Sequence, residues 1–420
     1  MKDSFTITDF SVLQAQLDHV PEHRVLAALA RDHCTGKDLA ALLSPAAEPF
    51  LPQLAARSRE ITRQRFGRTT QIYAPLYLSN YCVNRCAYCG FSAGNRIHRR
   101  KLTLDEAVAE AEILRRRGFQ HILLVSGEAP AVLDVDYLEA IARRLRDRFA
   151  AVSIEVQPLD EDEYARLFRA GITAVAIYQE TYDRRVYDRV HLAGRKCDYD
   201  FRLATPARAA AAGMREVGIG ALLGLSDWRA EGLAIGLHLA WLRRRFWQTG
   251  FTVSFPRLRP AAGEFQPLVT VNEKNLSQLI FALRIFDPDV GLILSTREEP
   301  RYRDGMLGLG PTRYSAGSCT APGGYSHEDH DGEQFSVGDH RSVEEVCRVI
   351  RSRGFDPVCK DWDRAFQQVL EGPGTCHLHL SVGGCSCGHK SIGNYLEIPG
   401  LLRPAAGASP PSTQRVEKIQ

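Results

Sequence analysis

The sequence predicts an α/β protein built as a (β/α)8 barrel of the TIM type. Strand-like apolar runs alternate with helical stretches after residue 70, and seven such runs are clear, with a weaker eighth. Strands that alternate with helices form a parallel sheet. Polar residues follow the C-terminal ends of these runs, where barrel enzymes build their active sites. These observations favour a closed barrel over an open sheet.

The elements follow in order along the chain. Residues 1–70 are expected to be helical, with a buried face of leucines: Leu26, Leu29, Leu39, Leu42 and Leu43. Thr103 and Glu106 have the spacing of a capping box, which begins a helix that Gly118 ends, and a second helix is expected at 137–148. The strands are expected at 72–78, 121–125, 153–157, 173–178, 216–222, 251–255, 291–295 and, more weakly, 312–316.

Composition narrows the classes of function. The chain has 420 residues, a net charge of only +3 and no long run of like charges, so nucleic acid is not expected as a main partner. The N-terminus does not have the pattern of a signal peptide, and no stretch of about 18 apolar residues would span a membrane. We therefore expect a cytoplasmic protein, in which the eleven cysteines are reduced thiols or metal ligands.

The strongest motif is a group of three cysteines directly after the first predicted strand. Cys82, Cys86 and Cys89 are spaced Cys-x3-Cys-x2-Cys. A [4Fe–4S] cubane normally takes four thiolates, so three leave one iron open, and the amino and carboxylate groups of S-adenosylmethionine (SAM) can chelate that iron. The alternatives are a structural zinc site, which needs four ligands and usually paired hooks, or a non-catalytic scaffold.

Two motifs together resemble the radical SAM superfamily. The cysteine motif with Tyr88 is similar to the superfamily signature, and Ser126-Gly127-Glu128, after the second strand, resembles its motif for the SAM amino group. A carboxylate and backbone carbonyls suit an ammonium group. The resemblance implies that an electron from the cluster splits SAM and yields a 5′-deoxyadenosyl radical, while the protein supplies position and exclusion of water.

Further segments resemble the 2-iminoacetate synthase family, the tyrosine lyases of bacterial thiazole (thiamine) biosynthesis. The resemblance covers roughly residues 60–365 and implies a radical SAM core at 71–300 and a biotin/thiamine-synthesis region at 250–365. A Cys/His-containing tail is expected to be loosely ordered at 366–420. The segments are 73–80 (YAPLYLSN), 88–92 (YCGFS), 155–159 (EVQPL), 178–182 (YQETY), 220–227 (GALLGLSD), 254–260 (SFPRLRP), 294–298 (LSTRE), 322–325 (PGGY) and 360–363 (KDWD).

The resemblance implies that L-tyrosine is cleaved between Cα and Cβ into p-cresol and 2-iminoacetate. The implied partners are a thiazole synthase protein and a flavodoxin- or ferredoxin-type electron donor. The alternatives are the tyrosine lyase of [FeFe]-hydrogenase maturation and another aromatic amino acid lyase. The hydrogenase enzyme has a Cys-x2-Cys pair in its tail, which Cys376, Cys385 and Cys387 do not match, although they leave a tail metal site open.

The resemblance also assigns roles toward the substrate. Arg297 is expected to bind the tyrosine carboxylate in a bidentate fork, with Ser315 assisting. The alternative for Arg297 is a structural salt bridge with Glu298. Gln157 and Glu180 lie at the same predicted edge of the barrel and are expected to contact SAM or tyrosine.

Three further residues are expected to contact SAM. Glu128 is expected to bind the SAM ammonium, or else to be a solvated carboxylate at a helix start. Arg257 binds the SAM carboxylate or braces the barrel. Tyr88 packs near the adenine or shields the cluster.

Overall fold

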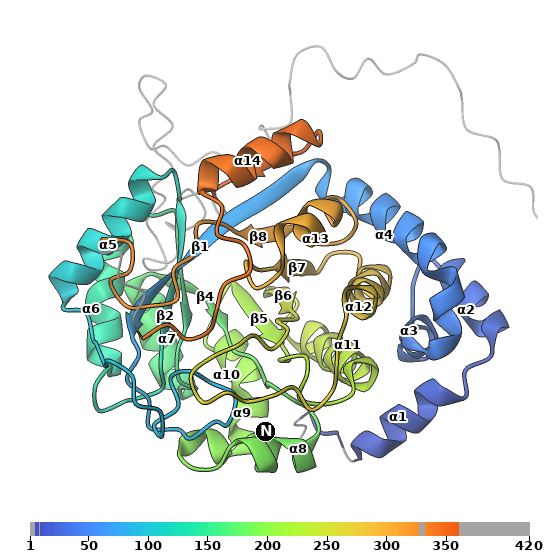
Figure 1. The fold of residues 1–420 in the computed structure, drawn as a ribbon, viewed down its shortest axis with the longest axis horizontal. Helices are drawn as coiled ribbons and strands as arrows, with labels where there is room; N and C mark the ends of the chain where they lie inside the picture. The colour runs from blue at the N-terminus through green and yellow to red at the C-terminus, as the bar shows by residue number, and fades with distance from the viewer. Residues whose placement is uncertain (1–4, 8, 327–331, 361–420) are drawn as a thin grey trace, which may run out of the picture. The chain divides into compact units, whose positions relative to one another are not determined.

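Eight parallel strands close into a barrel at the centre of the computed structural model, which describes residues 5–7, 9–326 and 332–360 (Figure 1). Each strand pairs with the next, and the first also pairs with the eighth, so the ring is complete. The predicted barrel and its weak eighth strand are therefore confirmed. The strands are β1 Thr69–Ser79, β2 His121–Ser126, β3 Ala151–Glu155, β4 Ile172–Ala176, β5 Glu216–Gly220, β6 Gly250–Ser254, β7 Gly291–Leu294 and β8 Arg313–Ser315.

The long strand β1 closes the barrel because different parts of it pair with different neighbours. Residues 71–73 lie opposite β8, and residues 74–79 lie opposite β2. Its first residues, 69–71, pair with a ninth strand, β9 Asp356–Val358, which the sequence did not predict. The residues of β9, Asp-Pro-Val, include a charged side chain and a proline and form no apolar run. The end of β1 leads straight into the cysteine motif.

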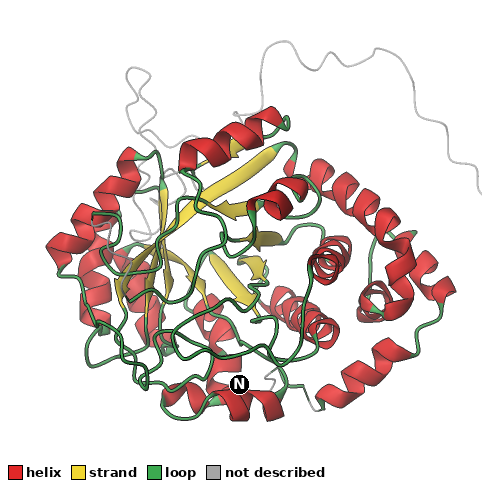
Figure 2. Cartoon of the chain, viewed as in Figure 1, coloured by secondary structure: helices red, strands yellow, loops and turns green. Residues whose placement is uncertain are grey.

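Helices surround the strands (Figure 2). The helical character of residues 1–70 was predicted. Helix α3 packs on α11 and α12, and α4 packs on α12. The bounds are α1 Phe10–Asp18, α2 Glu22–Leu29, α3 Gly36–Leu43, α4 Leu51–Phe66, α5 Leu104–Arg116, α6 Val135–Leu145, α7 Glu161–Ala170, α8 Arg184–Val190, α9 Tyr199–Leu203, α10 Thr205–Ala211, α11 Trp228–Arg245, α12 Glu273–Phe286, α13 Pro300–Gly305 and α14 Val343–Ser352, with short 3-10 turns at Pro45–Phe50 and Arg195–Cys197.

Local capping signals set where two of these helices begin. Both hydrogen bonds of the Thr103–Glu106 capping box form at the start of α5, as predicted. Helix α6 begins two residues earlier than expected because the Asp134 side chain accepts a hydrogen bond from the backbone N–H of Tyr137 at 2.8 Å. An aspartate at this position satisfies an N–H that has no partner inside the helix.

One predicted core residue is wrong. Leu26 is 51% exposed, whereas Leu39, Leu42 and Leu43 are fully buried. Helix α2 starts after Pro21, and that start turns Val25 and Ala28 toward the core in place of Leu26.

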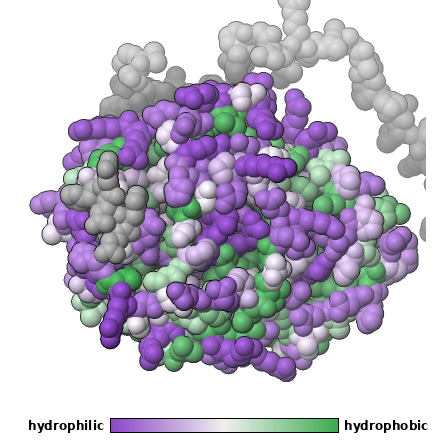
Figure 3. Space-filling model, in the orientation of Figure 1, coloured by the Kyte–Doolittle hydropathy of each residue, from purple (hydrophilic) through white to green (hydrophobic). Residues whose placement is uncertain are grey.

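The surface of the barrel face is mostly hydrophilic, with smaller hydrophobic patches between (Figure 3). Among the described residues, no helix is long and apolar enough to cross a membrane. The domain boundaries drawn from the sequence stay predictions, and Cys376, Cys385 and Cys387 lie outside the described residues.

Candidate active site

The three motif cysteines lie on the loop that follows β1. All three are free thiols, and Cys86 is buried. Arg99 fixes the backbone of this loop. Its guanidinium donates hydrogen bonds to three carbonyl oxygens, those of Asn80 at 2.6 Å, Phe91 at 2.8 Å and Ser92 at 2.7 Å. The loop that carries the thiols is therefore fixed by charge-assisted hydrogen bonds to its backbone.

The chemistry of these thiols fits a bound metal cluster. Burial raises the pKa of Cys86 and Cys89, so both thiols keep their protons at neutral pH unless a cation is bound. Coordination to a metal removes those protons. Among the described residues, no three His, Cys, Asp or Glu side chains are arranged to hold one metal ion. A cubane needs no such arrangement, because each cysteine binds a different iron atom.

The Ser126-Gly127-Glu128 segment packs directly against the cysteine loop. The backbone N–H of Gly127 donates to the carbonyl of Ser79 at 2.9 Å, and a Cβ at Gly127 would overlap the carbonyl oxygen of Tyr81. Only glycine allows this approach. The Ser126 hydroxyl is buried and has no hydrogen-bond partner within the described part of the chain. An unpartnered buried hydroxyl beside the cysteine loop fits a polar ligand such as SAM.

Four charged side chains of alternating sign form a network next to this segment. Arg202 donates to Glu128 at 2.8 Å and to Glu180 at 3.4 Å, and Lys196 donates to Glu180 at 2.7 Å. Burial raises the pKa of Glu128 and Glu180, but the two cations outweigh burial and hold each carboxyl below its ordinary value. Glu128 also accepts from the Asn84 amide at 2.8 Å, so it is an enclosed anion and not a solvated one.

Glu180 has a left-handed backbone, with φ of 71°. This conformation is unfavourable for a residue with a side chain and persists only where neighbours enforce it. The carboxylate of Glu231 on α11 supplies such enforcement, since it accepts hydrogen bonds from the backbone N–H of Tyr182 at 2.9 Å and from the Thr181 hydroxyl. The strain presents the Glu180 side chain to the cavity.

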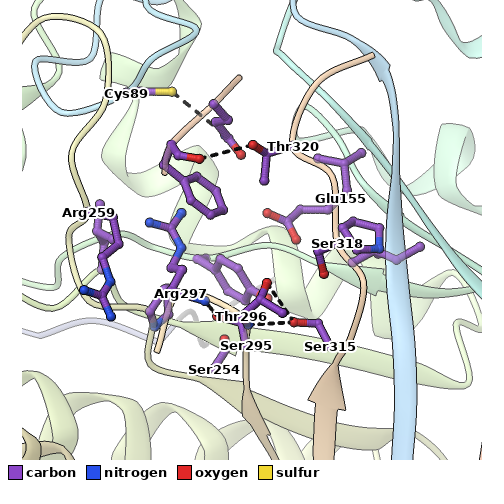
Figure 4. Close-up of a pocket in the computed structure, with 18 of the residues that line it drawn as sticks. Cys89, Glu155, Ser254, Arg259, Ser295, Thr296, Arg297, Ser315, Ser318 and Thr320 are labelled. Carbon is purple, nitrogen blue, oxygen red and sulfur yellow. Dashed lines mark hydrogen bonds between the residues drawn. The ribbon is translucent and has the colours of Figure 1, made fainter. Parts of the chain in front are cut away.

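A cavity opens at the C-terminal ends of the strands, below the cysteine loop (Figure 4). Cys89 lies in its wall, so the cysteine loop and the cavity are one site. Polar and aromatic side chains from six of the eight strands, or from the loops after them, complete the wall. They include Tyr73, Tyr77, Tyr88, Glu155, Tyr178, Glu180, Lys196, Ser254, Arg259, Ser295, Arg297 and Ser315.

Arg297 lies inside this cavity with its charge uncompensated by any ion pair to a described residue. Its guanidinium carbon lies 3.3 Å from the centre of the Phe335 ring, and the guanidinium donates one hydrogen bond to a described residue, at 3.4 Å to the Arg257 carbonyl. Glu298, the alternative partner weighed from the sequence, instead binds Arg257, with 3.0 Å between Nε and each carboxylate oxygen. Arg297 is thus available to a carboxylate from outside the chain.

The structure brings some of the predicted residues into the cavity and leaves others outside. Tyr88 lines it, with its hydroxyl 2.8 Å from Nε2 of His191, and Ser315 lines it while accepting from the backbone N–H of Thr296 at 2.8 Å. Arg257 is absent from the wall, and its ion pair with Glu298 favours the bracing role. Gln157 donates to the carbonyl of Leu133 at 3.0 Å and lines a separate hollow.

Sequence reasoning missed four charged residues of the site. Glu155 ends β3, but the strand was predicted to end at Gln157, so the residue expected in the site was two positions too late. Arg259 stands in a segment quoted for resemblance and was given no role. Lys196 and Arg202 follow β4 in a loop and a short helix, where no motif marks them.

Comparisons with known proteins agree with this geometry. The Radical SAM superfamily matches residues 76–234, and the Biotin and Thiamin Synthesis associated domain matches residues 254–356. A 2-iminoacetate synthase of Escherichia coli K12 is 45% identical over 364 residues, covering 86% of this chain and 96% of the relative. Its Salmonella typhimurium counterpart is 45% identical over 337 residues, covering 80% and 89%. The solved structure of HydG, a maturase of the [FeFe]-hydrogenase, superposes with a TM-score of 0.79 at 33% identity, covering 83% of this chain and 80% of that one.

Proposed function

The chain belongs to the 2-iminoacetate synthase family of radical SAM enzymes, and from this premise we propose that it cleaves the Cα–Cβ bond of L-tyrosine. The products are 2-iminoacetate and p-cresol, and SAM is consumed to 5′-deoxyadenosine and methionine. The observation that carries the proposal is that Cys89 and the uncompensated Arg297 line the same cavity.

Cys82, Cys86 and Cys89 would hold the [4Fe–4S] cluster, and the adjoining cavity would hold SAM and tyrosine. When bound, these cofactors supply a 5′-deoxyadenosyl radical that removes one hydrogen atom from tyrosine. The protein's part is to orient the substrate and to exclude water from the reacting atoms. The aromatic wall of the cavity suits a phenol ring.

The two substrates bring two carboxylates, and the cavity wall has two arginines. Arg297 is the partner proposed for the tyrosine carboxylate, with Ser315 at the same end of the barrel. Arg259 has two buried guanidinium nitrogens without a hydrogen bond to a described residue, although Glu298 lies 3.6 Å away. It therefore suits the SAM carboxylate better than Arg257, whose guanidinium is already bound.

The remaining proposed contacts to SAM come from the segments around β2 and β4. The Ser126 hydroxyl and the backbone at Gly127 face the amino group, with Glu128 supplying negative charge behind them. Glu180 is placed to accept from the ribose or the substrate ammonium, and Tyr88 to pack near the adenine. Gln157, outside the cavity, supports the strand end from which Glu155 enters it.

The partners proposed are a thiazole synthase protein, which would take up the imine, and a flavodoxin- or ferredoxin-type electron donor. Tyrosine cleavage for hydrogenase maturation is the rival use of the same chemistry. The 45% identity to 2-iminoacetate synthases over most of both chains favours the thiazole pathway over the 33% identity to HydG.

The test is an anaerobic assay of the reconstituted protein with SAM, dithionite and one amino acid at a time. Tyrosine should yield p-cresol and 5′-deoxyadenosine in equal amounts. Consumption of another amino acid without p-cresol from tyrosine would refute the substrate assignment. Absence of 5′-deoxyadenosine under any reductant would favour a non-catalytic scaffold.

A further inference from the structure

The cysteine loop forms a short two-stranded ladder with the segment after α8. The backbone N–H of Arg85 donates to the carbonyl of Ala193 at 2.9 Å, and that of Leu192 donates back to the carbonyl of Arg85 at 2.8 Å. The antiparallel bridge between Cys86 and His191 lies next to this pair. A cluster ligand is therefore built into a small piece of sheet at the surface of the barrel.

Side chains alternate across this ladder as they do in a strand. Asn84, Cys86 and His191 point inward, and each is at most 4% exposed. Val83 is 47% exposed and Leu192 59% exposed, and Arg85 between them is exposed too. The outward face, which we name the ladder face (Val83, Arg85, Leu192 and Arg195), is thus separated from the cluster ligand Cys86 by a single backbone layer.

The ladder face joins exposed apolar side chains to positive charge. Seven large apolar side chains of the described chain are more than a third exposed. Three of them are Val83 and Leu192 of the ladder face and Tyr81, which is two residues before Val83 in the chain. Such a local gathering indicates an interaction site more than scattered exposure does. Arg85 forms no ion pair with any described residue, so its charge is open to a partner.

The charges around the face are not all of one sign. Arg195 also borders the hollow lined by Asp134, Asp136, Asp160 and Glu163, and Asp188 lies exposed on α8. Of the two arginines of the ladder face, Arg195 has four carboxylates around the hollow that it borders, whereas Arg85 has no ion pair with a described residue. The test therefore changes Arg85.

We propose that the ladder face is the docking surface for an acidic one-electron carrier protein that reduces the cluster. This inference rests on the proposed function, because only a protein that binds a redox cluster needs such a donor. The carrier loses one electron and the oxidised cluster gains it. Electron-transfer partners bind through small, weak interfaces, in which opposite charge steers the encounter and a few apolar contacts suffice. None of the four residues of the ladder face lines the substrate cavity, so the carrier and the substrates do not compete for space.

The experiment compares two reductants on the reconstituted enzyme. Arg85→Glu should lower 5′-deoxyadenosine formation about tenfold when reduced flavodoxin is the donor, and leave it within about twofold with dithionite, which needs no docking surface. Leu192→Ser should act in the same direction. Arg24→Glu reverses the charge of an exposed residue on α2, which lies at the right-hand edge of Figure 1, away from α8. This variant should change neither rate. Added salt should slow the wild type with flavodoxin and affect Arg85→Glu less.

Each other outcome overturns the proposal. An equal fall with both reductants would mean that Arg85 supports the cluster itself, and unchanged flavodoxin rates would place the donor elsewhere. Loss of an oligomer by light scattering in Arg85→Glu would make a second copy of the chain the occupant of the face. If the wild type forms no product even with dithionite, the proposed function fails separately. Titration of flavodoxin binding, with tenfold weaker affinity expected for Arg85→Glu, still decides the docking surface.

Discussion

Lys196 donates a hydrogen bond to the carboxylate of Glu180 at 2.7 Å and fixes the wall of the cavity between two loops. Both side chains are nearly buried, 11% and 13% exposed. The Lys196 ammonium also lies 5.8 Å from the centre of the Tyr88 ring, next to the cluster ligands. One lysine therefore connects the strained residue Glu180 to the cysteine loop.

Replacing this lysine should destabilise the protein through its partner. In Lys196→Met, Glu180 loses its nearest cation, its pKa rises, and a buried carboxylate is left with Arg202 alone at 3.4 Å. Breaking a buried pair from one side costs about 3 kcal/mol. Urea unfolding should show this loss, and Lys196→Met combined with Glu180→Gln should recover most of it. Equal stability of the single variant and the wild type would mean that the pair contributes nothing.

The cluster ligand Cys86 gives a second prediction. Cys86→Ala should lose the brown chromophore and most bound iron and should form no 5′-deoxyadenosine, because two thiolates hold a cubane poorly. Iron analysis and absorbance after anaerobic reconstitution measure this. Cys34→Ala is the matched control, because Cys34 is a free, partly buried thiol just before α3 that contacts the Ala28 carbonyl and does not line the cavity. Wild-type iron content in Cys86→Ala would contradict the cluster assignment.

Much of the fold was predictable because its signals are local. Seven of the eight strands are apolar runs that are recognisable from their own residues, β8 is a weaker segment, and Thr103 with Glu106 marks the start of α5 within four positions. The predicted burial of Leu26 was wrong because the orientation of a two-turn helix depends on where Pro21 starts it and on what the helix packs against. Strand β9 was not predicted because Asp356-Pro357-Val358 form no apolar run, and only their pairing with β1 makes them a strand.

The site was predictable only where a motif records it. The cysteines and Ser126-Gly127-Glu128 are contiguous patterns, and Arg297 follows a strand end. Lys196 and Arg202 reach the site through the turn and short helix after β4, so only the folded chain brings them to Glu128 and Glu180. The partner of Glu298 could not be chosen from sequence, because Arg297 is its neighbour in the chain, whereas the arginine that the fold brings to it, Arg257, stands 41 residues earlier.

Glu155 should make stability depend on pH in an unusual direction. Burial, followed by the charge of Glu180, raises its pKa from 4.5 to about 7. The folded chain therefore binds a proton here more tightly than the unfolded chain does. Its contribution to stability is largest below pH 4.5, falls as the pH rises to 7, and stays low above that. Glu155→Gln should accordingly be more stable than the wild type at pH 8, by up to about 3 kcal/mol, with little difference near pH 4.5.

Unfolding by urea at the two pH values, wild type against Glu155→Gln, measures this difference. A carboxyl that weakens the fold at working pH indicates a role in the cavity. The pH profile of kcat/KM for tyrosine should therefore show an ionisation near pH 7 in the wild type that is absent in Glu155→Gln. A stability difference that is the same at pH 4.5 and pH 8 would show that folding does not shift the pKa of Glu155.

Arg297 tests the orientation of the substrate. A guanidinium that binds a carboxylate through two charge-assisted hydrogen bonds contributes about 2 kcal/mol, so Arg297→Ala should raise the KM for tyrosine about 30-fold. Arg297→Lys should recover only part of this, because an ammonium keeps the charge but lacks the planar fork. Iron content and the KM for SAM should stay near the wild-type values, since Arg297 contacts Phe335 and the Arg257 backbone and not the cysteine loop. Arg259→Ala is the matched variant and should raise the KM for SAM instead. If both variants change the same KM, the two arginines do not bind separate carboxylates, and the assignment of Arg297 to tyrosine and Arg259 to SAM is wrong.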